Sequence, residues 1–402
     1  MLTASACSGM FVFGLVMALL GAVLPSLAAR LQFTVGDIGA LFLVMNFAML
    51  VCCLVLGMAM DRYGMKPALA IGPLLVAAAL LLIARASTFA GLYPAVALLG
   101  LGGGALNGAA NTLTADLHDD PQHKGAALNR VGVFFGFGAL LLPFLIGSLL
   151  ARFGLNILLL AAAAITAAVG VFAALLRFPV PKQAAQFRAA DLSRLLRAPL
   201  LLLFAALLFF ESGVEFTLGG FLSTYVTRGL GVTSVSLASW ILASYWLAVM
   251  VARVPLSRLA LVWDPFRILT MCAIGALAGA LIIAAAPGLG VATFGIVLTG
   301  FSLSGVFPTV VGIAGARFES HSGTAIGVLL ATALTGGMIV PWLSSQIAAA
   351  AGLRWAFAGV AAAFAAILIL SRVACGADRS ERASATKRVV FEPAEIPTCG
   401  SR

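Results

Sequence analysis

Two glutamates, Glu211 and Glu215, lie inside a long apolar run where a charged group is costly. Counting from Pro199, a rise of about 1.5 Å per residue places them roughly 18 and 24 Å along a helix, whereas the hydrocarbon layer is about 30 Å thick. Their spacing of four residues puts both side chains on one helical face. Two carboxylates so close in a low-dielectric medium cannot both ionise cheaply, so we expect the pair to hold a proton near neutral pH and to titrate as a unit. Acids at this depth mark ion or substrate pathways, or only bridge neighbouring helices.

A second set of side chains with binding chemistry lies in other apolar runs, at Asn46, Asn107, Asn111, Trp246 and Gln346. Amides offer paired hydrogen-bond donors and acceptors, and an aromatic face can cover the C–H face of a sugar ring, so the set suits a polyhydroxylated solute. Asn107 and Asn111 also share one helical face at a spacing of four. The alternative is structural: a transmembrane amide often joins two helices, for about 0.6 kcal/mol on average, and Trp246 can equally be packing.

The composition indicates that these side chains act inside a membrane. Of 402 residues, 62% are hydrophobic and 9% charged, and the mean hydropathy is +1.12. Such a chain is a polytopic membrane protein. The net charge of +10 could suggest a nucleic-acid partner, but the basic residues lie between the apolar runs, without a basic patch interleaved with aromatics. The six cysteines show no CxxC spacing, so we expect no disulfide framework and no metal site.

Windows of about 19 residues predict an all-α membrane protein with twelve transmembrane helices. The predicted domains are an N-terminal six-helix bundle (1–176), a central loop (177–198), a C-terminal six-helix bundle (199–375) and a disordered tail (376–402). The predicted spans are 7–29, 37–59, 67–86, 89–114, 126–150, 155–176, 200–227, 234–255, 266–286, 289–314, 324–349 and 353–374.

Lys and Arg are unevenly divided between the two sides of these spans. Connections of one parity, with the helix start at Arg130 and the C-terminal end, hold 19 of the 24 basic residues, and Arg253 is counted among them. The positive-inside rule then places both termini and the central loop in the cytoplasm of a cell whose plasma (inner) membrane holds the protein. The excess positive charge is mostly a topology signal.

The two halves of the chain repeat each other at a constant offset of 198 residues. This offset aligns Gly138 with Gly336 and Pro143 with Pro341, and it also aligns pairs of Arg and His. Six plus six helices in parallel repeat predict two bundles related by an axis along the membrane normal, with a binding site at the midplane between them. Glu215 aligns with Met17, so the acidic pair belongs to one half only.

A short connection between the second and third spans carries a recognisable motif, formed by Gly57, Asp61, Arg62, Gly64 and Lys66. Gly57 allows close helix approach, Gly64 permits a tight turn, and Asp61 can pair with a nearby base or a helix N-terminus. The segment resembles the GxxxDRxGRK loop of the major facilitator superfamily, with Met65 where a base is usual. The resemblance implies that this loop takes part in conformational change, and the twelve spans and central loop also look like that superfamily.

Five longer segments resemble the fucose permease group of that superfamily, whose members mostly move sugars together with protons or sodium. The resemblance places an acid of the seventh helix at Glu215 and also matches Trp246 and Phe307. It departs at Asn107, where several members have an acid, and in the first span, which has none. The burden of coupling would therefore fall on Glu211 and Glu215. The segments are 100–117, 127–145, 213–228, 245–253 and 305–318.

These observations predict a secondary transporter of a small polar solute, a sugar or sugar derivative, working by alternating access with proton or sodium coupling. We expect no cofactor, no nucleic-acid partner and a monomer in the bilayer. No nucleophile with its base and no nucleotide loop is visible, so an enzyme is not expected. The alternative is an efflux antiporter for drugs or metabolites, because the run from Gly138 to Pro143 partly resembles a motif of drug/proton antiporters, with Leu142 in place of the key glycine.

Overall fold

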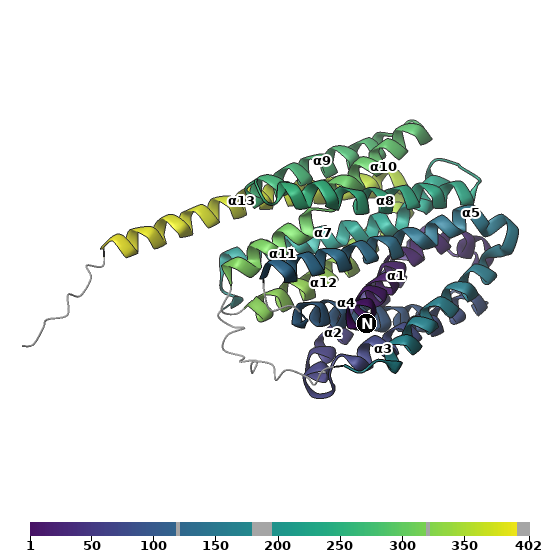
Figure 1. Cartoon of the computed structure of the whole chain (residues 1–402). Helices are drawn as coiled ribbons and strands as arrows, with labels where there is room; N and C mark the ends of the chain where they lie inside the picture. The colour runs from purple at the N-terminus through teal and green to yellow at the C-terminus, as the bar shows by residue number, and fades with distance from the viewer. Residues whose placement is uncertain (118–120, 179–194, 319–321, 392–402) are drawn as a thin grey trace, which may run out of the picture.

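The chain is an all-helical bundle in the computed structural model (Figure 1). The backbone is described for residues 1–117, 121–178, 195–318 and 322–391, and the side chains of the same residues except 57, 58, 61, 121–126, 129, 322 and 381–391. Most of the predicted central loop therefore lies outside the described residues. The helices are α1 (Leu2–Leu31), α2 (Val35–Tyr63), α3 (Lys66–Arg85), α4 (Leu92–Asp116), α5 (Pro121–Leu175), α7 (Pro199–Thr224), α8 (Val235–Leu259), α9 (Pro265–Ala285), α10 (Leu289–Leu303), α11 (Val306–Arg317), α12 (Ser322–Ala351) and α13 (Leu353–Phe391), with a π-helical turn (Tyr225–Gly229) after α7.

Among the described residues, eleven segments are long and apolar enough to cross a membrane. One of them, the 46-residue stretch Arg130–Leu175 of α5, is two helices, because the backbone at Gly154 leaves the helical region with φ 72° and ψ 162°. A continuous helix of that length would measure about 69 Å, more than twice the thickness of a hydrocarbon layer. Divided at Gly154, the described residues supply twelve segments long and apolar enough to cross, the number that the apolar runs predict.

The same helix contact occurs in both halves, at the predicted offset of 198. In the first half α1 crosses α5 where a side chain on Gly138 would collide with the carbonyl of Phe11, and in the second half α7 crosses α12 where a side chain on Gly336 would collide with the carbonyl of Phe209. Adding 198 to the residue numbers of Phe11 and Gly138 gives Phe209 and Gly336, so the two contacts are equivalent. The backbones touch at these points only because the residue is glycine.

The connections between helices lie on two faces of the bundle. We call the "terminal face" the one where α1 begins and α2, α8 and α11 end, and the "opposite face" the one where α1, α7 and α12 end. Arg30 at the end of α1 marks the opposite face, because it donates hydrogen bonds to the carbonyls of Ile83 and Ala84 at the end of α3 and to Asn156 just after the break in α5.

The two halves press against each other near the opposite face. The backbone of Gly21 in α1 meets the carbonyl of Gly219 in α7, with no room for a side chain on Gly21. On α2, the ring of Phe42 fills the space where a side chain on Gly220 would lie, and the carbonyl of Gly36 accepts a hydrogen bond from Gln346 of α12.

Glycines toward the terminal face are not packed in this way. Within the described part of the chain, an added side chain would meet no atom within 4 Å at four glycines of α11 and α12, namely Gly312, Gly315, Gly323 and Gly327. The structure is thus closed between the halves at the opposite face.

Helix α13 extends through the first part of the segment that we expected to be disordered, and it ends at Phe391. The stretch from 377 to 392 contains no Gly or Pro and several good helix formers, so nothing stops the helix before Pro393. The rest of the expected tail, residues 392–402, lies outside the described residues.

An ion pair anchors α13 to α11 near the terminal face. Nε of Arg317 lies 2.5 Å from a carboxylate oxygen of Asp378, whose side chain is 4% exposed, against 25% for Arg317. Because removing one partner leaves the other charge poorly solvated, we expect Asp378→Asn to lower the free energy of unfolding by about 3 kcal/mol. The measurement is the thermal unfolding temperature in detergent. Asp37→Asn, which changes a capping residue of α2 whose hydrogen bonds are exposed, is the control; equal shifts in both variants would contradict a stabilising role for the pair.

Candidate functional site

The acidic pair lies near the middle of the membrane span formed by α7 and its π-helical turn. Glu211 is buried, with 2% of its surface exposed, and Glu215, one turn further on, is half-buried. The next turn on the same side carries Gly219, where an added side chain would come within 3.0 Å of the ring of Trp246 and 3.8 Å of the carbonyl of Met17. The side of α7 that carries the acids is therefore turned toward α8 and α1, inside the protein.

Neither glutamate side chain has a bonded partner in the described part of the chain. No hydrogen bond or ion pair involves either side chain there, and Oε2 of Glu211 is fully buried without a partner. Leaving a buried polar atom unpaired costs about 1–3 kcal/mol, and more for a charged group. Among the described residues, the glutamates therefore do not form an ion pair that bridges two helices.

Helix α8 supplies the neighbours of the acidic pair. Tyr245 and Arg253, eight residues apart on one side of α8, both interact electrostatically with Glu211 and Glu215. The hydroxyl of Tyr245, Nε1 of Trp246 and Nε of Arg253 are buried without a partner among the described residues. The two helices thus bring together a carboxylate, a phenol, an indole and a guanidinium, a combination that can donate to and accept from a polar solute.

Arg253 belongs to this cluster and not, as its place in the sequence predicts, to the basic residues of the connections. Its Nη1 donates a 2.8 Å hydrogen bond to the carbonyl of Gly132, and its guanidinium carbon lies 5.4 Å from the centre of the Phe135 ring. Both partners belong to α5, in the other half. The available signal was its position within an apolar run that continues to Val254 and Leu256, because a topology-determining Arg would stand beyond the last apolar residue.

Asn107 and Asn111 form a second polar group, on α4. Both are half-buried, and Nδ2 of Asn111 donates to the backbone carbonyl of Asn107 at 2.9 Å and to its side-chain oxygen at 3.0 Å. Helix α4 packs against α1, α2, α3 and α5, all in the first half. The structure therefore brings the two asparagines together, and it keeps them in the half opposite the glutamates.

The other predicted contacts lie elsewhere. Asn46 is fully buried and donates to the carbonyls of Phe42 and, across the halves, of Gly337, both at 3.0 Å. Gln346 is exposed near the opposite face and donates to the carbonyl of Gly36 at 3.1 Å. Both amides thus join the halves.

The two predicted aromatic contacts differ in burial. Trp246 is fully buried, with its ring edge-on to Phe135 at 6.1 Å between ring centres. Phe307 is half-buried on α11.

The loop motif between α2 and α3 is partly described. The side chains of Gly57 and Asp61 lie outside the described ones. Gly64 ends α2 with φ 77°, a left-handed conformation that favours glycine, as the tight turn requires. Arg62 lies over the ring of Tyr63 at 5.3 Å, and Lys66 begins α3.

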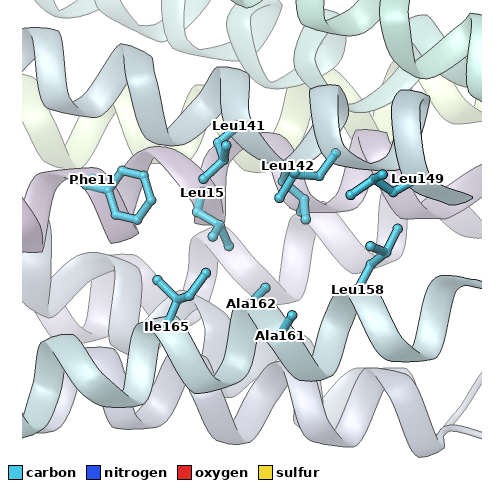
Figure 2. Close-up of a pocket in the computed structure, with 10 residues that line it drawn as sticks. Phe11, Leu15, Leu141, Leu142, Leu149, Leu158, Ala161, Ala162 and Ile165 are labelled. Carbon is cyan, nitrogen blue, oxygen red and sulfur yellow. The ribbon is translucent and has the colours of Figure 1, made fainter. Parts of the chain in front are cut away.

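An apolar pocket of about 170 Å³ lies between α1 and the two limbs of α5 (Figure 2). Leu141, Leu142 and Leu149 line it from one limb, Leu158 and Ile165 from the other. Leu141 and Leu142 belong to the Gly138–Pro143 stretch. The lining contains no polar side chain, so the pocket is separate from the acidic cluster. No group of three His, Cys, Asp or Glu among the described residues could hold a metal ion.

Solved structures with the same fold include several transporters. A mutant of the Escherichia coli fucose:proton symporter FucP superposes with a TM-score of 0.67 at 21% sequence identity, covering 92% of this chain and 98% of that one. A D-xylose-proton symporter gives 0.77 at 12% identity, covering 92% and 96%, and a mutant of the nucleoside transporter NupG gives 0.76 at 16%, covering 94% and 99%. At these identities the likeness shows the fold.

Sequence comparison gives the family directly. A search of curated protein sequences found no match. The family profile described as Major Facilitator Superfamily matches residues 6–296 and 207–395, which together span nearly the whole chain. The chain therefore belongs to the major facilitator superfamily.

Proposed function

We propose that the protein is a secondary transporter of a small polar organic solute, a sugar or sugar derivative, coupled to a proton or a sodium ion. The observation that carries the proposal is the acidic pair of α7, which faces the protein interior near mid-membrane with neither carboxylate bound to a partner among the described residues. Family membership makes the chain a transporter and not an enzyme. Two of the similar folds are named as sugar–proton symporters, which supports the solute class.

The roles follow from what each side chain can reach. Glu215, which is half-buried, exchanges the coupling ion, and the deeper Glu211 shares its charge. Asn107 and Asn111 bind the solute from the first half, while Trp246 and Phe307 provide apolar faces in the second. Asn46 and Gln346, which the sequence predicts as solute contacts, donate to backbone carbonyls across the halves, and we assign them to holding the halves together.

Alternating access requires that the halves separate at one face while they touch at the other. In this structure they touch at the opposite face, where Gly21 meets Gly219. Without Arg253, the connections of the parity that ends at the terminal face still hold 18 of the 24 Lys and Arg in the sequence. By the positive-inside rule that face lies in the cytoplasm, so the structure corresponds to a state closed to the outside. We place the protein as a monomer in the plasma (inner) membrane, with both termini cytoplasmic.

Transport in proteoliposomes tests this function. Purified protein would be reconstituted, and uptake of labelled fucose, xylose, a sugar acid and a nucleoside would be followed with an imposed proton gradient, with a sodium gradient, and with neither. We expect accumulation of at least one solute above equilibrium with one of the two gradients. Facilitated movement that never exceeds equilibrium would contradict coupling, and no movement of any polar solute would contradict the solute class.

The rival function, efflux of apolar compounds, has one observation in its favour, the apolar pocket beside α5 (Figure 2). Resistance to apolar drugs and uptake of sugars would be compared in a host that lacks its own transporters. The variant Leu142→Phe, which fills the pocket, separates the two functions: loss of resistance supports efflux, whereas unchanged sugar uptake supports the acidic cluster as the transport site.

A further inference from the structure

Five hydrogen bonds join the two halves within the described residues, and in each a side chain donates to a backbone carbonyl. Asn46, Arg228, Ser345 and Gln346 make four of them. The fifth, from Arg253 to Gly132, is the shortest at 2.8 Å. It alone originates from the cluster around the acidic pair.

Arg253 has two competing attachments. On one side are the carbonyl of Gly132 and the ring of Phe135, both uncharged groups of α5. On the other side are the carboxyls of Glu211 and Glu215, which interact electrostatically with Arg253 but do not form an ion pair with it within 4.0 Å. Nε of Arg253 and Oε2 of Glu211 are both buried without a partner, so each retains capacity for a further contact.

The charge of the acidic pair decides which attachment is stronger. A guanidinium attracts a carboxylate as one full charge attracts its opposite and can bind it through two parallel hydrogen bonds, whereas it attracts a neutral carbonyl only as a dipole. A protonated carboxyl loses most of this advantage, whereas the carbonyl of Gly132 and the ring of Phe135 are unaffected by pH. Within the described residues, only these two glutamates act on Arg253 electrostatically. Tyr245 is the other titratable group of the cluster. On α5, Arg130 lies two residues before Gly132, and its side chain is exposed.

We propose that Arg253 is a charge-controlled link between the two halves. When the acidic pair is protonated, the guanidinium holds the carbonyl of Gly132 and α8 stays attached to α5, as in this structure. When the pair loses its protons, the guanidinium moves to the carboxylates and releases α5. The inference rests on the proposed function only in taking the acidic pair as the ion site, and it adds a positioning residue through which the occupancy of that site changes the contact between the halves.

Distance measurements between spin labels test the link without any solute. Labels would be placed at Val133 of α5 and Leu261 just beyond α8, which are 47% and 84% exposed, in a background in which the six native cysteines are replaced. Between pH 5 and pH 9 we expect the population with the longer distance to rise at least about fivefold, the lower end of typical coupling between sites.

Four variants decide the outcome. Arg253→Gln should lose the pH dependence and favour the longer distance at both pH values, whereas Glu211→Gln/Glu215→Gln, which imitates the protonated pair, should keep the shorter one at both. Arg228→Gln, which removes the other arginine that joins the halves, is the matched control and should keep the full pH response. Arg253→Lys keeps the charge and should retain a reduced pH response. If the arginine variants do not fold, the double glutamate variant still tests the link, because it leaves Arg253 in place.

A pH response that is absent from the unsubstituted protein, or that persists in Arg253→Gln or in the double glutamate variant, would overturn the link. An equal loss in Arg228→Gln would also overturn it. Failure here is distinguishable from failure of the proposed function, because accumulation of a solute is measured separately. If Glu215→Gln loses accumulation while the pH response is unchanged in all variants, the coupling role of Glu215 stands and Arg253 has no part in it.

Discussion

Gly21→Ala is expected to separate the two halves at the opposite face and to reduce transport by about tenfold or more. The added methyl group would collide with the backbone carbonyl of Gly219, and the side chain of Leu242 lies only 3.2 Å from the same position. A carbonyl within a helix cannot turn aside as a flexible side chain can. Overpacking of this kind costs about 1–3 kcal/mol, which corresponds to a shift of roughly 5- to 150-fold in a two-state equilibrium.

The measurement for Gly21→Ala is the rate at which a thiol reagent labels Ser345→Cys in detergent, in a background without the native cysteines. Ser345 is buried and donates to the carbonyl of Gly36 in the other half, so it becomes accessible only when the opposite face opens. We expect labelling to accelerate by about tenfold, in proportion to the shift in population. Ser371→Cys, buried within α13, should not respond.

Gly9→Ala is the matched control for the substitution itself. Gly9 also lies on α1, but its added methyl group would meet the end of the Leu69 side chain at 3.0 Å, inside the first half. That side chain can give way, so we expect near-normal labelling. Equal labelling of Ser345→Cys in Gly21→Ala and in the parent would show that α1 and α7 can slide apart without opening the face.

The fold was predictable because membrane physics acts on short stretches of sequence. Apolar runs long enough to span the bilayer indicated the long apolar helices of the described residues, including the two that the structure joins through Gly154. The repeat was predictable because the same backbone contact needs glycine at the same place in each half, as Gly138 and Gly336 show. Helix α13 continued beyond its apolar run because helix propensity, not hydropathy, determines where it stops.

The site was predictable only in part. A carboxylate inside an apolar run is conspicuous in any sequence, so Glu211 and Glu215 could be selected, but their orientation depends on how α7 packs on α8 and α1. Arg253 stands near the end of a run, where a basic residue ordinarily marks the membrane surface, and only the approach of α5 shows that it points inward. A transmembrane asparagine looks the same in sequence whatever it contacts. The sequence therefore could not show that Asn46 donates across the halves while Asn107 accepts from Asn111 within one helix.

Glu215→Gln is expected to remove ion-driven accumulation while exchange of the solute across the membrane continues. Glutamine keeps the shape and the hydrogen-bonding capacity of a protonated carboxyl but cannot release a proton. A proton moving through 100 mV supplies about 2.3 kcal/mol, enough for roughly fifty-fold accumulation, and this driving force is lost when the site cannot change its charge. Solute binding needs no such change, and Glu211 can still lose its proton and draw Arg253 away from Gly132, so the halves still move and exchange remains.

Glu211→Gln is the matched variant, because the same substitution one turn away tests which acid exchanges the ion. Glu215 is half-buried, whereas Glu211 is 2% exposed. We therefore expect Glu211→Gln to retain a substantial part of the accumulation that Glu215→Gln loses. Proteoliposomes with equal amounts of each variant would be compared for accumulation under an imposed gradient and for exchange without one. Unchanged accumulation in Glu215→Gln would remove the coupling role from this residue, and an equal loss in both variants would mean that the two carboxyls act as one inseparable site.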